Sequence, residues 1–182
     1  MIDSHSRVIR DLRISITDRC NFRCVYCMEP DVRFMPAAEL LSVDEIYRLA
    51  RVAVGLGVQK LRITGGEPTL HPELLRIISS LASTGVNDIA MTTNGWHAEV
   101  AALESWRAAG LRRLTVSIDS LDPARFQQIT RSKSTPDDVI RTIRNAKAAG
   151  FDPVKINAVV VRGWNEEDVP LLAALALSLI HI

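Results

Sequence analysis

Apolar and polar residues follow two different periods along this chain, and the two periods alternate. Short runs rich in β-branched residues predict five strands, at residues 12–17, 60–64, 88–93, 113–118 and 154–161. Longer runs with helical spacing and helix-boundary residues predict five helices, at residues 43–55, 72–83, 97–109, 137–149 and 166–176. This order predicts an α/β fold of βα repeats with parallel strands. Periodicity alone leaves open an open doubly wound sheet or a barrel.

The residues with the most distinctive chemistry come at the carboxyl ends of the predicted strands. Three cysteines follow the first strand, and Gly-Gly-Glu-Pro at 65–68 follows the second. Thr-Asn-Gly at 93–95 ends the third strand, and Ser117 and Asp119 end the fourth. Both candidate architectures place ligand sites at this edge of the sheet. Ligand binding at that edge is therefore expected.

Composition narrows the class of protein. The chain has 182 residues, 47% of them hydrophobic and 24% charged, which is typical of one soluble globular domain. The net charge is +1 and no basic run is interleaved with aromatics, so no nucleic-acid partner is expected. No apolar run reaches the roughly 20 residues of a membrane-spanning helix, so no membrane association and a cytoplasmic location are expected.

The cysteines are Cys20, Cys24 and Cys27, and the chain has no others. An odd number within one short segment does not indicate a disulfide framework. A structural zinc site needs four protein ligands, and no fourth cysteine or well-placed histidine is visible. Three thiolates on one loop can instead hold three corners of a [4Fe-4S] cubane and leave the fourth iron open to another ligand. The spacing C-x3-C-x2-C therefore predicts such a cluster.

With the Gly-Gly-Glu-Pro segment after the second strand, the cysteine motif resembles that of the radical S-adenosylmethionine (SAM) superfamily. The resemblance implies that the open iron binds the amino and carboxylate groups of SAM, and that one electron cleaves SAM to a 5′-deoxyadenosyl radical. It also implies a partial TIM barrel of radical SAM type, here the first five βα units of a (β/α)6 barrel with the sixth strand missing. The glycines allow close approach of a ligand, and Glu67 offers a carboxylate to the SAM ammonium group.

A longer resemblance points to the GTP 3′,8-cyclase family of molybdenum-cofactor biosynthesis. It rests on residues 10–24, 92–95, 109–113, 117–119, 153–157 and 162–165. In that family the adenosyl radical removes the 3′ hydrogen of GTP, and the C3′ radical attacks C8 of guanine to give (8S)-3′,8-cyclo-7,8-dihydro-GTP. The resemblance implies SAM contacts at Tyr26, Gly66 and Ser117, and GTP contacts at Arg13, Arg62, Thr92 and Lys155. It further implies an external one-electron donor and, for the longer family form, a homodimer.

Other interpretations stay open at this level. The strand cations could point outward beside a helix carboxylate, and Thr92 and Ser117 could be ordinary strand-end hydroxyls. Arg23, Trp96 and Trp164 are as well suited to packing as to binding. A peptide-maturing radical SAM enzyme is the alternative within enzymes, and a non-catalytic iron-sulfur module is the alternative outside them.

The C-terminal end carries its own expectation. Residues 1–176 are expected to form an incomplete radical SAM core. Residues 177–182 resemble the translation of a DNA-library adapter, which predicts a non-native tail on a fragment. The second [4Fe-4S] cluster of the cyclase family is expected in a longer chain, because its three cysteine ligands are absent from this sequence.

Overall fold

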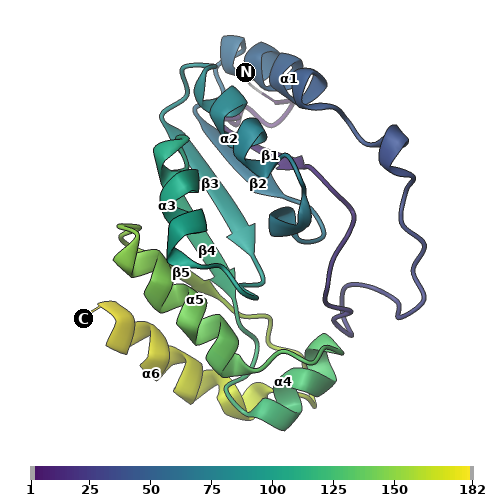
Figure 1. Cartoon of the computed structure of the whole chain (residues 1–182), viewed down its shortest axis with the longest axis vertical. Coiled ribbons are helices and arrows are strands. Elements are labelled where there is room, and N and C mark those ends of the chain that lie inside the picture. The colour runs from purple at the N-terminus through teal and green to yellow at the C-terminus, as the bar shows by residue number, and fades with distance from the viewer. Residues whose placement is uncertain (1–2, 181–182) are drawn as a thin grey trace.

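The computed structural model describes residues 3–180 and shows one five-stranded sheet with helices outside it (Figure 1). The strands lie in chain order and are β1 (Asp11–Ser15), β2 (Lys60–Thr64), β3 (Asp88–Thr93), β4 (Arg113–Ser117) and β5 (Lys155–Asn157). Every neighbouring pair is parallel. The predicted α/β fold of parallel strands is confirmed, and the sheet is a partial barrel.

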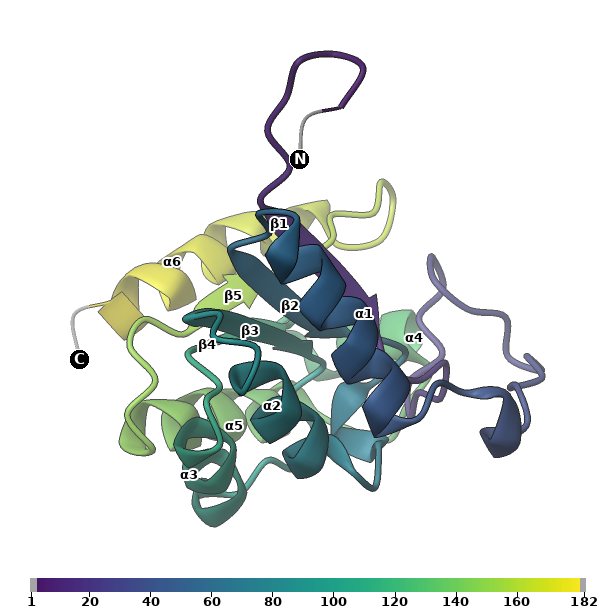
Figure 2. The ribbon, with the colours of Figure 1, turned by 90° about the horizontal axis from the view of Figure 1, so that it is seen from above.

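Within residues 3–180, six α-helices connect and cover the strands. They are α1 (Val43–Gly55), α2 (Leu74–Ala82), α3 (Val100–Ala108), α4 (Pro123–Thr130), α5 (Pro136–Ala148) and α6 (Val169–Ile180). Three short 3-10 turns are η1 (Ala37–Glu39), η2 (Pro68–Leu70) and η3 (Glu166–Asp168). Seen from above, α1, α2, α3 and α5 lie along one face of the sheet (Figure 2).

The strands have one apolar and one polar face because successive side chains point to opposite sides. Leu61, Ile63, Met91, Leu114 and Val116 are fully buried in the core under the helices. The alternate positions carry polar side chains on the other face, among them Arg13, Arg62, Thr92, Thr115 and Lys155. The sheet therefore directs its polar residues toward the inside of the partial barrel.

The fourth strand is followed by two helices rather than one, which corrects the simple βα repeat predicted from the sequence. Helix α4 occupies a segment for which no helix was predicted. Its start carries two recognisable signals, since the Asp122 side chain accepts a hydrogen bond from Arg125 N at 2.7 Å and Pro123 stands at the first helical position. The helix is only eight residues long, so its apolar period is weak.

Strand β5 is shorter than predicted, with three residues instead of eight. Beyond Asn157 the backbone amides bond to side chains and leave the strand. Val159 N donates to the Asp119 carboxylate at 2.9 Å, and Val161 N donates to the Asn165 side chain at 2.7 Å. Side-chain acceptors thus compete with the sheet ladder here.

Helix α6 extends to Ile180, beyond the predicted end at residue 176. Residues 177–180 of the expected non-native tail continue this helix, and residues 181 and 182 lie outside the described residues. Among residues 3–180, no helix has both the length and the apolar character needed to cross a bilayer.

Candidate functional site

The cysteine loop, residues 20–27, follows β1 and is held by the carboxyl end of α4. Arg23 N donates to Thr130 O at 2.8 Å, and Val25 N donates to Ile129 O at 2.9 Å. These carbonyls belong to the last turn of the helix and lack partners within it. The Phe22 side chain is buried and meets Phe126 edge-on, with ring centroids 6.0 Å apart. The helix that the sequence pattern did not predict is thus a support of the site.

Arg23 acts within the loop itself. Its guanidinium donates to the carbonyls of Cys20 at 2.6 Å and Phe22 at 2.8 Å, and it lies over the Phe34 ring at 4.9 Å. A second turn forms where Cys27 N and Met28 N both donate to Cys24 O. Arg23, to which the sequence assigned no role, fixes the backbone that carries the first cysteine.

The three thiols form no disulfide, and Cys20 and Cys24 are partly buried whereas Cys27 is exposed. Burial raises the pKa of Cys20, and burial together with the nearby Asp119 raises the pKa of Cys24 to about 12. The other two thiols add to the shift at Cys24, so the three groups lie close enough to interact. A bound cation reverses this balance because it favours the thiolate.

The donor set fits an iron-sulfur cluster better than a single ion. Across residues 3–180, no three His, Cys, Asp or Glu side chains converge on one metal-ion position. A cubane binds each cysteine through a different iron, so its thiols do not need to meet at one point. Three interacting thiols on one anchored loop, with no disulfide among them, satisfy this requirement.

Glu67 is buried, with 1% of its surface exposed, and its carboxylate is engaged by protein donors. It accepts from Thr69 N and Oγ1, from Thr93 Oγ1 at 2.7 Å and from Asn94 N at 2.7 Å. These bonds join the ends of β2 and β3. The contact to the SAM ammonium group expected for Glu67 stays a prediction, and its observed partners are protein groups.

Gly66 lies where β2 meets the backbone that leads into the cysteine loop. A Cβ atom added there would lie 2.3 Å from Arg19 O and 2.5 Å from Asp18 O. Gly66 N also donates to Thr17 O at 2.6 Å, and Glu67 N donates to Arg19 O at 2.7 Å. Only glycine permits this approach, which places the Gly-Gly-Glu-Pro turn directly beside the loop.

Two further polar residues contact the loop without having been assigned a role from the sequence. The Asn94 side chain donates to Asn21 Oδ1 at 2.7 Å and lies 4.0 Å from Cys20 Sγ. Asp119 accepts a hydrogen bond from the Tyr26 hydroxyl at 2.6 Å, and burial raises the pKa of this carboxyl. The position of Asn94 and Asp119 just after β3 and β4 was the one sequence signal that could have indicated a role at the site.

The four residues expected to contact GTP share the polar face of the sheet. Arg13 and Arg62 are direct cross-strand neighbours. Thr92 lies opposite Thr115, which in turn lies opposite Lys155. No ion pair found within the described chain engages Arg13, Arg62 or Lys155. No ion pair therefore supports the alternative in which these strand cations point outward beside a helix carboxylate.

Ser117, expected to contact SAM, ends β4 on this same face. It lies opposite Asn157 of β5 and is partly buried. Tyr26 is exposed for 43% of its surface despite its bond to Asp119. The SAM and GTP contacts thus remain predictions for residues that the fold places on the inner face and at the carboxyl edge.

A partial α/β barrel with three free thiols on the loop after its first strand defines a class of iron-sulfur enzyme. Residues 14–176 match the model of the Radical SAM superfamily, and the chain belongs to that superfamily. Its cofactors are accordingly a [4Fe-4S] cluster and SAM.

Among curated relatives, the chain is similar to proteins named GTP 3′,8-cyclase. It is 44% identical to that of Marinobacter nauticus over 97% of this chain and 53% of the relative. It is 47% identical to that of Acidothermus cellulolyticus over 99% of this chain and 51% of the relative. The chain therefore spans about half the length of these proteins.

Solved structures agree on the fold. Streptococcus suis SuiB bound to S-adenosylmethionine superposes with a TM-score of 0.78 at 20% identity, covering 94% of this chain and 38% of that one. Coproporphyrinogen III oxidase from Escherichia coli, titled a radical SAM enzyme, gives a TM-score of 0.65 at 16% identity, covering 94% and 41%. At these identities the likeness shows the fold alone.

Proposed function

We propose that this chain is the SAM-binding core of a GTP 3′,8-cyclase of molybdenum-cofactor biosynthesis. The reaction joins C3′ of the ribose to C8 of guanine and yields (8S)-3′,8-cyclo-7,8-dihydro-GTP. One observation carries the proposal: in a chain 44% to 47% identical to proteins of that name, the expected GTP residues align on one polar face.

Cys20, Cys24 and Cys27 would hold the [4Fe-4S] cluster on the loop anchored by α4. Tyr26, Gly66, Glu67 and Ser117 would surround SAM at the carboxyl edge of the sheet. When bound, the cluster supplies the electron for reductive cleavage of SAM to the 5′-deoxyadenosyl radical. The electron comes from an external one-electron donor, and a reducing cytoplasm keeps the ligand thiols free.

Arg13, Arg62 and Lys155 would bind the triphosphate from inside the barrel, and Thr92 would add a hydroxyl. Guanidinium groups form paired hydrogen bonds to phosphate oxygens, whereas the Lys155 ammonium acts as a point charge. The adjacent Arg13 and Arg62 repel each other unless an anion lies between them. A polyanionic substrate thus accounts for cations placed on an inner face.

The test combines SAM and GTP binding in the full 182-residue chain. After anaerobic reconstitution, addition of SAM is expected to change the EPR spectrum of the reduced cluster. GTP binding, measured by calorimetry, is expected to weaken about tenfold or more in Arg62→Ala and in Lys155→Ala, because each loses a charge-assisted contact. Arg144→Ala, on the exposed side of α5, is the matched control.

The outcomes separate the alternatives. Unchanged GTP binding in both variants would contradict the cyclase proposal and favour a peptide substrate. An EPR spectrum that does not respond to SAM would indicate a non-catalytic iron-sulfur module. The second [4Fe-4S] cluster and the homodimer belong to the proposal for the longer enzyme and are tested on a chain that carries the additional cysteines.

A further inference from the structure

The cysteine loop is bonded to the segment between β5 and α6, although the two are far apart in the sequence. Asp119, at the end of β4, joins them. Its carboxylate accepts from the Tyr26 hydroxyl at 2.6 Å through one oxygen and from Val159 N at 2.9 Å through the other. Asp119 is 4% exposed, so the acceptor of both bonds is buried, although Tyr26 itself is 43% exposed.

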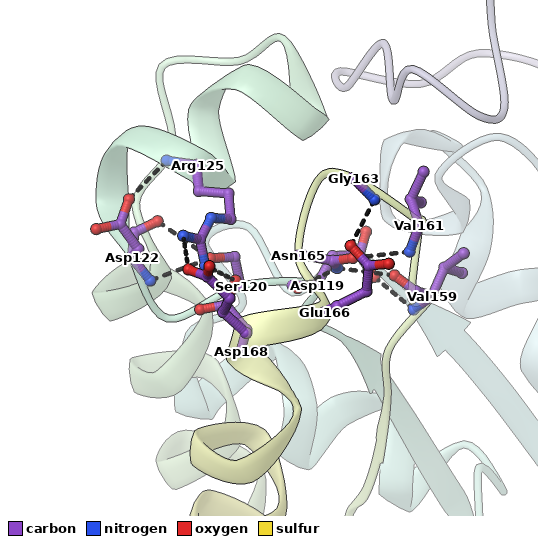
Figure 3. Close-up of polar contacts among 11 residues, drawn as sticks. Asp119, Ser120, Asp122, Arg125, Val159, Val161, Gly163, Asn165, Glu166 and Asp168 are labelled. Atoms are coloured by element: carbon purple, nitrogen blue, oxygen red, sulfur yellow. Dashed lines mark hydrogen bonds and ion pairs between the residues drawn. The ribbon is translucent and has the colours of Figure 1, made fainter.

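Asn165 holds this junction from the other side (Figure 3). Its side-chain amide donates to Asp119 O at 2.6 Å and to Val159 O at 2.9 Å, and its oxygen accepts from Val161 N at 2.7 Å. The residue is fully buried. One asparagine thus binds the backbone on both sides of the bond between Asp119 and Val159.

A second connection runs from the same segment through α4. Arg125 of α4 lies 3.0 Å from the Asp168 carboxylate of η3 (Figure 3). It also lies 3.1 Å from the carboxylate of Glu167 in the same turn. The carboxyl end of α4 in turn accepts the backbone amides of Arg23 and Val25 from the cysteine loop. The loop therefore has two attachments, and each leads to residues 159–168.

We propose that Asp119 is a positioning residue. Together with Asn165, it makes the position of Cys24 and Cys27 depend on the conformation of residues 159–168. Tyr26 lies between these two cysteines, so its hydroxyl is the point at which the attachment through Asp119 reaches the loop. The inference rests on the proposed cluster at the three cysteines. It requires no contact between Asp119 or Asn165 and the cluster.

The first test uses the full chain before reconstitution. Tyr26→Phe removes one hydroxyl from an exposed ring and leaves the charges in place, so it is not expected to impair folding. We expect alkylation of Cys24 by iodoacetamide, mapped by mass spectrometry, to become about tenfold faster relative to Cys20. Tyr47→Phe, which alters the other tyrosine of the chain, is the matched control and is expected to change nothing.

The second test follows the reconstituted protein. Iron loss to a chelator is expected to be about tenfold faster in Tyr26→Phe and in Asn165→Ala, and the double variant to be little faster than either single one, because both act on one connection. The EPR change on adding SAM should become heterogeneous in Asn165→Ala, which alters none of the proposed SAM contacts. A Tyr26→Phe protein with wild-type alkylation and iron loss would overturn the proposal, as would independent effects in the double variant.

These outcomes are separate from those for the proposed function. No readout involves GTP, so a chain that fails to bind GTP can still show the dependence on Tyr26 and Asn165. If the wild-type chain takes up no cluster, the cluster assignment fails, and the alkylation ratio alone decides whether Asp119 positions the loop.

Discussion

The cysteine loop and the Glu67 turn lie side by side at the same edge of the sheet, yet their polar groups are in opposite situations. The Glu67 carboxylate is almost fully buried and accepts four hydrogen bonds from Thr69, Thr93 and Asn94. The Cys24 thiol is partly buried among acidic neighbours, which raises its pKa to about 12.

The difference separates structural from ligand-binding roles. A buried carboxylate with every oxygen engaged stabilises the fold, since its donors would otherwise be unsatisfied. The thiolate forms of these cysteines are unfavourable beside Asp119 and one another, and a bound metal compensates their negative charge. The hydrogen bonds of Glu67 hold the ends of β2 and β3 together, whereas the cysteines are available to a ligand.

The largest expected effect is the loss of the cluster when one of the cysteines is replaced. Cys24→Ala should reduce iron and sulfide content after reconstitution to background, because two thiolates do not retain a cubane. The melting temperature of the apoprotein should stay within a few degrees of wild type. Met28→Ala, next to the loop, is the control and should retain iron. A Cys24→Ala protein with full iron content would exclude this cysteine as a ligand.

Glu67→Ala, in contrast to Cys24→Ala, should lower the stability of the apoprotein. Loss of the shared acceptor leaves the Thr93 hydroxyl and the Asn94 amide without a partner, so we expect urea unfolding to show a loss of about 3 kcal/mol. Glu73→Ala, which removes only an exposed pair with Arg76, should cost less than about 0.5 kcal/mol. Wild-type stability combined with lost SAM binding would instead support the ligand role predicted from the sequence.

Gly66→Ala tests the close contact between the two regions. The added Cβ would collide with the carbonyls of Asp18 and Arg19, so the turn and the loop must separate. We expect about 2 kcal/mol of destabilisation and weaker SAM binding. Gly55→Ala, where an added Cβ meets no atom within 4 Å, should be neutral or slightly stabilising. Equal unfolding curves for the two variants would show that the contact is readily relieved.

The smallest expected effect concerns a carboxylate that accepts protein hydrogen bonds, as Glu67 does, but is less buried. Asp138 caps α5 and accepts from Thr135 N at 2.9 Å, which holds its pKa below the ordinary value of 3.8. Its contribution is therefore complete above that pH and is lost as the pH falls through the lowered pKa. Asp138→Asn should cost about 1 kcal/mol at pH 7 in urea unfolding. The difference from wild type should shrink toward pH 2, and a constant difference would contradict this origin.

The sequence predicted the parts of this molecule that depend on local pattern. Strands β2 and β3 and helix α1 have the predicted bounds, because alternation and a Ser42 capping box act within a few residues. The cysteine motif was likewise readable, since ligand number and spacing lie within one loop. Helix α4 was missed because its eight residues give only a weak apolar period, although Asp122 and Pro123 mark its start. Its contact with the cysteine loop through Ile129 and Thr130 is long-range, and no local pattern encodes it.

The long-range hydrogen bonds of Asp119, Asn165 and Glu67 could not be predicted from the sequence either. Asp119 and Glu67 stood at recognisable strand ends. The partners of Asp119, and those of Glu67 other than its neighbour Thr69, lie in other segments. Glu67 in particular reads as a free carboxylate until β3 brings Thr93 and Asn94 to it. Register and long-range packing decide which polar residue is already satisfied and which remains available to a ligand.

The distance along the chain between the loop and its supports has a consequence for biosynthesis. The cysteines precede their supports along the chain, because Tyr26 bonds to a residue 93 positions later and the α4 anchor lies further still. A growing chain emerges amino end first, so the thiols are exposed before their supports have been made. The hydrogen bonds that anchor the loop can therefore form only after residues 119–130 have been made, and until then its thiols lack these supports.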